Sequence, residues 1–151
     1  MELIMSIIIY PGTNASETFS DNPNTNSNDM LLGFGGNDHI TAHGGNDLLD
    51  GGYGNDYMEG GAGSDIFRFR EASASQPLER DTIGDFNTSQ DTLQWIGQEG
   101  IYTEYTVAQK GNDTLITVNS QLDSGLVTHE ILLLGVQSSD LSESNYDIHF
   151  V

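Results

Sequence analysis

The sequence predicts an all-β fold: a parallel β-roll (a right-handed parallel β-helix) capped by a C-terminal antiparallel β region. Three observations support this fold class. A nine-residue period runs through the first half of the 151-residue chain, and each unit places a carboxylate two residues before an apolar residue. The period stops after Arg68, and runs of alternating residues bounded by turn residues follow.

The nine-residue period is clearest in four blocks that follow one another without a gap, at 33–41, 42–50, 51–59 and 60–68. An earlier block, 24–32, keeps the register without the glycines, and block 12–20 fits after residues 21–23 are skipped. The sixth position is always acidic: Glu17, Asp29, Asp38, Asp47, Asp56 and Asp65. The eighth is always apolar: Phe19, Leu31, Ile40, Leu49, Met58 and Phe67.

Each block reads as a turn followed by a very short strand. Glycine and asparagine in the first six positions permit the left-handed backbone of tight turns, and the last three positions form a strand whose middle side chain points inward. One such strand buries nothing alone, so two blocks form one coil and block n stacks on block n+2. Stacking brings the carboxylates together, and their oxygen-only surroundings favour a hard cation.

The blocks at 51–59 and 60–68 match the pattern G-G-x-G-x-D-x-U-x, in which U is a large apolar residue, and they resemble the RTX (repeats in toxin) family. The blocks at 33–41 and 42–50 depart from the pattern at the second position, with Phe34 and His43, and at the first with Ala42. The resemblance implies several Ca²⁺ ions bound between turns, and a chain that folds on binding calcium outside the cell.

The resemblance also implies a ligand scheme for each ion. Carboxylates at position six come from both turns, with backbone carbonyls from positions one and three of one turn and two and four of the other. The first site would use Asn24, Asn26, Asp29, His43, Gly45 and Asp47. The second would use Gly33, Gly35, Asp38, Gly52, Gly54 and Asp56. The third would use Ala42, Gly44, Asp47, Gly61, Gly63 and Asp65.

Charge and composition exclude other partners. The net charge is −19, from 4 basic and 23 acidic residues, so nucleic acid and anionic membranes are unsuitable ligands. The chain has no cysteine, and therefore neither a disulfide framework nor a thiolate site. No stretch is long enough to insert into a membrane, and no signal peptide is evident, since the apolar run 3–10 reads better as a strand. A monomer is expected.

The second half, 69–151, is predicted to cap the roll at 12–68. Residues 69–79 are predicted to be a loop, and 81–97 resembles the segment that follows the last repeat in secreted RTX proteins, where aspartates complete terminal calcium sites. That resemblance implies roles for Asp81 and Asp85. A hairpin is expected from 102–109 and 114–119, then a strand within 127–136. A helical turn is expected at 140–145, with Asp140 and Glu143 as a capping pair.

The last residues, Asp147 to Val151, resemble the type I secretion signal of the same family, which implies a secreted, extracellular protein and the type I machinery as a partner. A final edge strand is the alternative interpretation, and the two are compatible. The chain would then be part of a larger secreted bacterial protein.

No catalytic motif is complete, so the chain is not expected to be an enzyme by itself. His129-Glu130 begins a zinc-protease pattern, but Leu133 stands where the second histidine is required. No G-x-S-x-G elbow occurs. The main alternative function is a carbohydrate-binding accessory module like those of alginate epimerases, with Phe34, Tyr53 and Tyr57 stacking on sugar rings. Trp95 is expected in the core.

Overall fold

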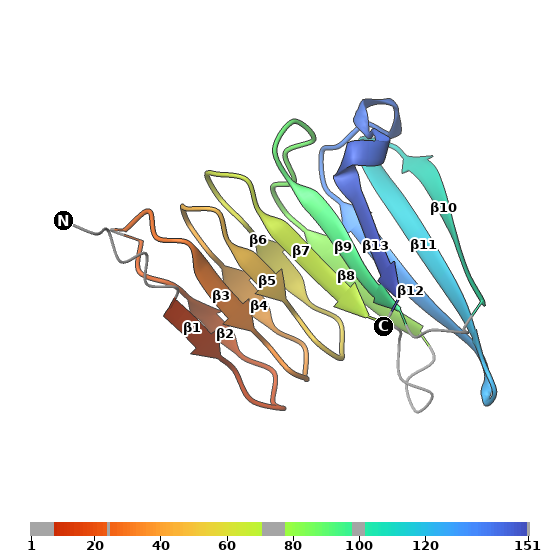
Figure 1. The fold of residues 1–151 in the computed structure, drawn as a ribbon, viewed down its shortest axis with the longest axis horizontal. Helices are drawn as coiled ribbons and strands as arrows, with labels where there is room; N and C mark the ends of the chain where they lie inside the picture. The colour runs from red at the N-terminus through yellow and green to blue at the C-terminus, as the bar shows by residue number, and fades with distance from the viewer. Residues whose placement is uncertain (1–7, 24, 71–77, 98–101, 151) are drawn as a thin grey trace.

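The computed structural model describes residues 8–23, 25–70, 78–97 and 102–150 as two β-sheets that enclose one core (Figure 1). The first sheet has the strand order β1 (Ile8–Pro11), β3 (Asp29–Leu32), β5 (Leu48–Asp50), β7 (Ile66–Arg70), β9 (Thr92–Gly97) and β13 (Tyr146–Phe150). The second has the order β10 (Tyr102–Lys110), β11 (Asp113–Leu122), β12 (Gly125–Leu133), β8 (Leu78–Ile83), β6 (Tyr57–Glu59), β4 (His39–Thr41) and β2 (Thr18–Ser20).

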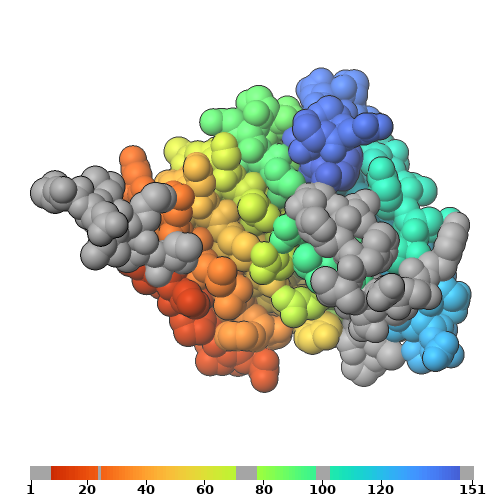
Figure 2. Space-filling model, in the orientation of Figure 1, coloured from red at the N-terminus to blue at the C-terminus, as the bar shows by residue number. Residues whose placement is uncertain are grey.

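The predicted roll is confirmed. Consecutive blocks alternate between the sheets, and each strand pairs in parallel with the strand of the block two places on, so Leu31 lies beside Leu49 and Leu49 beside Phe67. The inward residues Leu31, Ile40, Leu49, Met58 and Phe67 are all 0% exposed. Figure 2 shows the coils following one another along the molecule towards the C-terminal strands.

The roll runs further than the nine-residue period does. β8 continues the second sheet, with Ile83 beside Met58, and β9 continues the first, with Leu93 beside Phe67. The predicted loop at 69–79 is therefore wrong at both of its ends. β7 extends to Arg70 because Phe69 is buried at 3% exposure, and β8 begins at Leu78, while 71–77 lie outside the described residues. The predicted division of the chain at residue 68 stays a prediction.

The antiparallel cap grows directly out of the second sheet. The expected hairpin forms as β10 and β11, which turn at Gly111 and Asn112, and β12 pairs antiparallel with β11 on one side and parallel with β8 on the other. The third strand starts at Gly125, earlier than expected, and ends at Leu133. Trp95, at 6% exposure, lies in the core as expected.

The expected helical turn is two short 3₁₀ turns, η1 (Ser138–Asp140) and η2 (Glu143–Asn145), and the described residues contain no α-helix. Asp140 and Glu143 are not the capping pair. Instead the Ser142 N–H donates to Asn145 Oδ1 at 2.9 Å, and the buried Asn145 amide donates to the carbonyls of Thr88 and Asp91 at 3.0 and 3.1 Å. Asn145 is the capping residue because its side chain also donates hydrogen bonds to the segment that leads into β9.

The final strand, β13, pairs in parallel with β9 and forms the edge of the first sheet. The edge-strand interpretation of the C-terminus is thus correct for Tyr146–Phe150, and Val151 lies outside the described residues. The predicted strand at 3–10 appears as β1, from Ile8 to Pro11. Residues 3–7 of the prediction lie outside the described residues.

Candidate metal ladder

The position-six carboxylates form two columns, one beside each sheet. In the first column the backbone N–H of Asp29 donates to Oδ1 of Asp47 at 2.7 Å, and that of Asp47 donates to Oδ1 of Asp65 at 2.9 Å. The second column repeats the bond from Glu17 to Asp38 and from Asp38 to Asp56, both at 2.8 Å. One oxygen of each aspartate therefore fixes the preceding turn of its column.

In four of the repeat aspartates the second oxygen has no protein donor among the described residues. Within the described part of the chain, Oδ2 of Asp38, Asp47, Asp56 and Asp65 is buried without a hydrogen-bond partner. Oδ2 of Asp56 lies so close to Gly51, the first residue of its own block, that a Cβ at Gly51 would collide with it. An unpaired buried charge is strongly destabilising, so four such oxygens in two columns require a cation or a proton.

The same burial raises the pKa values of these aspartates. Burial, with the charges of neighbouring carboxylates added to it, raises the pKa of Asp47 and of Asp56 to about 7 and that of Asp65 to about 6. Hydrogen bonds from backbone N–H groups lower these pKa values, but by less than burial and the neighbouring charges raise them. A hard cation between the turns would replace the missing proton, and carboxylate oxygens suit Ca²⁺.

The second position keeps a positive φ in the two blocks where Phe34 or His43 replaces glycine. At the second position Gly52 and Gly61 have φ of +91° and +88°, and the departures Phe34 and His43 still adopt +69° and +54°. The His43 carbonyl, a predicted ligand, also accepts from Ala62 N at 2.9 Å. A carbonyl has two lone pairs, so this bond leaves one for a cation.

Position-five asparagines, to which the sequence analysis gave no role, hold the turns of both columns in register. Asn46 N donates to Asn28 Oδ1 at 2.8 Å, Asn55 N to Asn37 Oδ1 at 2.9 Å and Ser64 N to Asn46 Oδ1 at 2.9 Å. The signal was available, because asparagine fills position five in four consecutive blocks.

The structure stacks the turns that the ligand scheme requires. Gly35 lies beside Tyr53 and Gly44 beside Ala62, which joins the turns of the second and third predicted sites. In the first predicted site Asn26 lies against Gly44 and the Asp29 N–H binds Asp47, while Asn24 lies outside the described residues.

The segment after the repeats supplies the end of each column. Asp81 extends the second column, because Asp56 N donates to its Oδ1 at 2.8 Å. Asp85 lies outside both columns and accepts from Gly60 N and Gly61 N at 3.0 and 2.7 Å, so its role as a ligand stays a prediction. Asp91, which the sequence interpretation missed, extends the first column by accepting from Asp65 N at 3.0 Å. Its signal is the repeat-like spacing of Asp91 and Leu93.

Protein donors close both columns. The outer oxygen of Asp81 is 2.7 Å from His129 Nε2, and that of Asp91 accepts from Asn87 N at 2.8 Å. His129 is 1% exposed, with Phe69 and Trp95 edge-on to its ring and Glu79 at 3.8 Å from Nδ1. Burial alone would lower the pKa of His129, but the hydrogen bond to Asp81 and the charges of Asp81 and Glu79 raise it.

No group of three or more acidic or histidine side chains suited to a metal ion occurs in the described residues. That finding fits a site built from two carboxylates and several backbone carbonyls. The helices of the described residues include none long and apolar enough to cross a membrane.

Residues 27–67 match a family model described as the RTX calcium-binding nonapeptide repeat, in four copies. The fold is similar to that of the extracellular lipase LipA from Serratia marcescens, with a TM-score of 0.71 and 22% identity over 93% of this chain and 21% of the lipase chain. The chain thus spans about a fifth of that lipase. No curated protein sequence matches the chain.

Two modules of the Azotobacter vinelandii mannuronan C5-epimerase have similar structures. The AlgE6R3 subunit gives a TM-score of 0.66 and 29% identity over 93% of this chain and 83% of its own. The AlgE6R2 subunit gives 0.62 and 29% over 97% and 94%. Residues 27–67 are therefore RTX calcium-binding nonapeptide repeats, carried on a parallel β-roll that antiparallel strands close at one end.

Proposed function

We propose that this chain is a calcium-triggered folding module of a larger secreted bacterial protein and that it carries no catalytic site of its own. The observation that carries the proposal is the set of four buried oxygens of the repeat aspartates that have no protein donor in the described part of the chain. Without a cation they repel one another in a chain of net charge −19, and with one they become the attachment points of successive turns.

The ions would be held between turns n and n+2 by the ligand sets implied by the family. Asp47 would serve two ions, one shared with Asp29 and one with Asp65, while Asp38 and Asp56 would share another. Asp81 and Asp91 stand next in the two columns, and because both oxygens of each already contact protein donors, either would complete a terminal site only through its remaining lone pairs. The bound metal supplies charge neutralisation, and the protein supplies the stacking of the turns.

Calcium concentration would make the module a compartment switch. Extracellular calcium modules have dissociation constants of about 10⁻⁴ to 10⁻³ M, far above cytosolic calcium. At ten times the dissociation constant each ion adds about 1.4 kcal/mol, so three ions add about 4 kcal/mol. A small domain has a total stability of about 5–15 kcal/mol, so metal of this strength decides whether the chain folds.

Native mass spectrometry at increasing calcium tests the binding directly. The proposal expects at least three ions per chain, bound together with the gain of β structure. A chain that is fully folded in chelator and takes up no ions would contradict it.

The last strand would also act as the type I export signal, a proposal supported by the family resemblance of Asp147 to Val151. Export of the chain with and without these five residues through a type I exporter tests it. Because the deletion also removes pairing with β9, the purified variant must still fold with calcium before export is compared. Unchanged export of a folded variant would contradict the signal.

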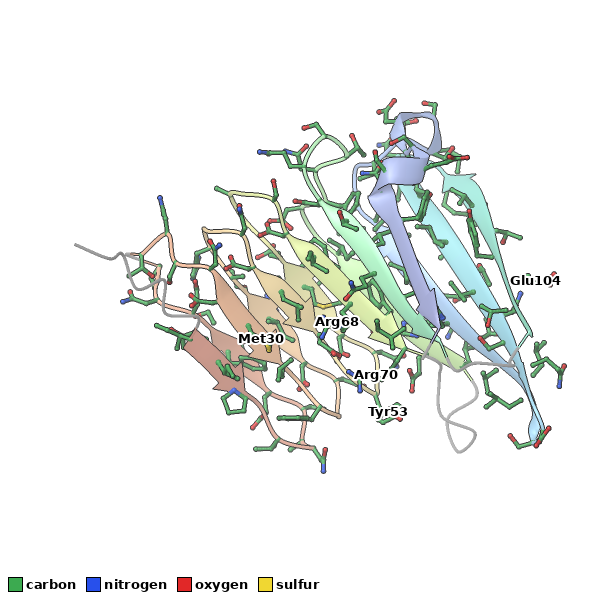
Figure 3. The ribbon with its side chains drawn as sticks, in the orientation of Figure 1. Met30, Tyr53, Arg68, Arg70 and Glu104 are labelled. Atoms are coloured by element: carbon green, nitrogen blue, oxygen red, sulfur yellow. The ribbon has the colours of Figure 1, made fainter. Side chains whose placement is uncertain are left out.

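A second candidate function, polysaccharide binding, is favoured by a hollow of about 250 Å³ on the roll. The exposed rings of Phe34 and Tyr53 border it, 49% and 46% exposed, together with Arg70, which is paired with Asp50. Figure 3 shows Tyr53 and Arg70 near one another at the lower edge of the roll, with Glu104 away from them beside the C-terminal strands. Aromatic rings and a cation are suited to an acidic sugar polymer.

Titration of the calcium-loaded chain with a polyuronate, followed by NMR, tests this candidate. Binding that weakens in Tyr53→Ala and Arg70→Ala, but not in the exposed control Tyr105→Ala, would support it. An absence of shifts in the native chain would rule it out.

A further inference from the structure

We propose that Asp21, which belongs to none of the nine-residue blocks, is an additional carboxylate ligand of the first calcium site. The inference rests on the proposed function, since it assigns a ligand to one of its sites. Residues 21–23 interrupt the period between blocks 12–20 and 24–32, and the repeat pattern gives no reason for them.

Asp21 is buried as deeply as the repeat aspartates and lacks any donor. It is 4% exposed, and in the described part of the chain neither of its carboxylate oxygens has a hydrogen-bond partner. Its backbone N–H binds the Thr41 carbonyl at 3.3 Å, which fixes the residue at the end of β2. A carboxylate outside the repeats is thus held in the interior with both oxygens unused.

The side chain lies at the first predicted site. Asp29 is near enough for the two carboxyl groups to interact directly, and the charge of Asp21 also acts on Asp47. The Nε2 atom of His43 lies 3.9 Å from Oδ1 of Asp21, too far for a hydrogen bond, on a side chain that is 36% exposed. Two buried carboxylates this close, Asp21 and Asp29, need a cation or a proton between them.

The first site also lacks an oxygen that the other sites have. The turn of block 24–32 contains no glycine. Its Ser27 hydroxyl donates to Oδ2 of Asp29 at 2.8 Å, so Asp29 keeps no unpartnered oxygen there. The corresponding oxygen has no donor among the described residues in Asp38, Asp47, Asp56 and Asp65. Asp21 replaces the oxygen that Ser27 occupies, which explains why the spacer and the glycine-free turn occur side by side.

The test compares Asp21→Asn with the exposed control Asp123→Asn by native mass spectrometry and calorimetric calcium titration of the full chain. Asparagine keeps the shape and removes the charge. We expect Asp21→Asn to lose one ion from the count, or to bind one ion about tenfold more weakly, because ligand charge sets the affinity of such sites. Asp123→Asn should match the native chain.

The variant Asp21→Asn/Ser27→Ala sharpens the test, because it frees Oδ2 of Asp29 and should recover part of the lost affinity. Native ion count and affinities in Asp21→Asn would overturn the inference. So would failure of both Asp21 variants to fold at saturating calcium while Asp123→Asn folds, since Asp21 would then be needed for another reason. A native chain that binds no calcium would instead refute the proposed function itself.

Discussion

The backbone N–H of Asp47 donates to Oδ1 of Asp65 at 2.9 Å, while Oδ2 of the same Asp65 is buried and has no donor among the described residues. One carboxylate therefore does two separate jobs. Its first oxygen holds the preceding turn of the column in register, and its second is left for a cation. Charge and shape can be tested apart, because asparagine retains the first oxygen and removes the charge.

Asp47→Asn should weaken calcium binding more than Asp29→Asn. Asp47 lies between two neighbours in its column, and its Oδ2 has no donor, whereas Asp29 stands near the end and its Oδ2 accepts from Ser27. We expect affinity for two ions to fall on the order of tenfold in Asp47→Asn, about 1.4 kcal/mol each, and for one ion in Asp29→Asn. Calorimetric titration measures both. Equal losses would show that stacking of block n on block n+2 does not share Asp47.

Gly63→Ala should prevent the turns from stacking, whereas Gly111→Ala should be tolerated. Gly63 has φ +144°, and a Cβ there would overlap the Gly45 carbonyl of the turn beneath. Gly111 also has positive φ, +67°, but no described residue lies within 4 Å of its Cβ position, so alanine costs about 1–2 kcal/mol of backbone strain alone. The urea midpoint at saturating calcium compares them. A similar midpoint for both would contradict the close contact of the turns.

The repeat half of the fold was predictable because its period is strict. Positions six and eight alone identify the inward residues from Leu31 to Phe67, and stacking then places the aspartates in columns. The family resemblance added the metal and its ligand scheme, which no local pattern contains. The hairpin at β10 and β11 was also readable, from alternation on both sides of a turn that contains glycine.

The features that escaped prediction depend on contacts between distant residues. Asp91 replaces a repeat aspartate in space, but a loop of different length precedes it, so the period hides it. Phe69 extends β7 because it packs in the core with Leu93 and Trp95 of the neighbouring strand β9. His129 contacts Asp81 only because β12 pairs with β8. Asp21 lies outside every block, and only its burial distinguishes it from a surface carboxylate.

Acid should partly replace calcium. The pKa values of about 7 for Asp47 and Asp56 and about 6 for Asp65 exceed the unfolded value of about 3.9. The folded chain without metal thus binds more protons than the unfolded chain, so its stability falls as pH rises from about 4 to about 7. In chelator, β structure should increase as pH drops from about 8 to about 5, and circular dichroism measures it. A loss of structure on this acidification would be the opposite of what burial predicts.

Calcium affinity should change in the other direction with pH. Protons compete with the metal for the same aspartate oxygens, so the affinity should fall as pH drops from about 7 to about 5. Calorimetric titrations in matched buffers measure this and the protons released. An affinity independent of pH in this range would mean that the raised aspartates are not the ligands.

Removing residues 69–151 should abolish cooperative calcium binding by the repeats. The deletion takes away Asp81 and Asp91, which bind the backbone of Asp56 and Asp65, and it uncovers Met58 and Phe67. Calorimetry on the 12–68 segment tests this, with the chain lacking only residues 1–11 as a control that keeps the capped end. If the isolated 12–68 segment folds with the calcium affinity of the full chain, the cap is dispensable.

Far-UV circular dichroism of the full chain during a calcium titration at neutral pH and low salt, together with the fluorescence of Trp95, its single tryptophan, tests the central claim most directly. The unpartnered aspartate oxygens predict a largely unfolded chain in chelator, with an exposed Trp95. They also predict that β structure and burial of Trp95 appear together as calcium rises through about 10⁻⁴ to 10⁻³ M. Full β structure and a buried Trp95 in chelator, both unchanged by calcium, would contradict the account.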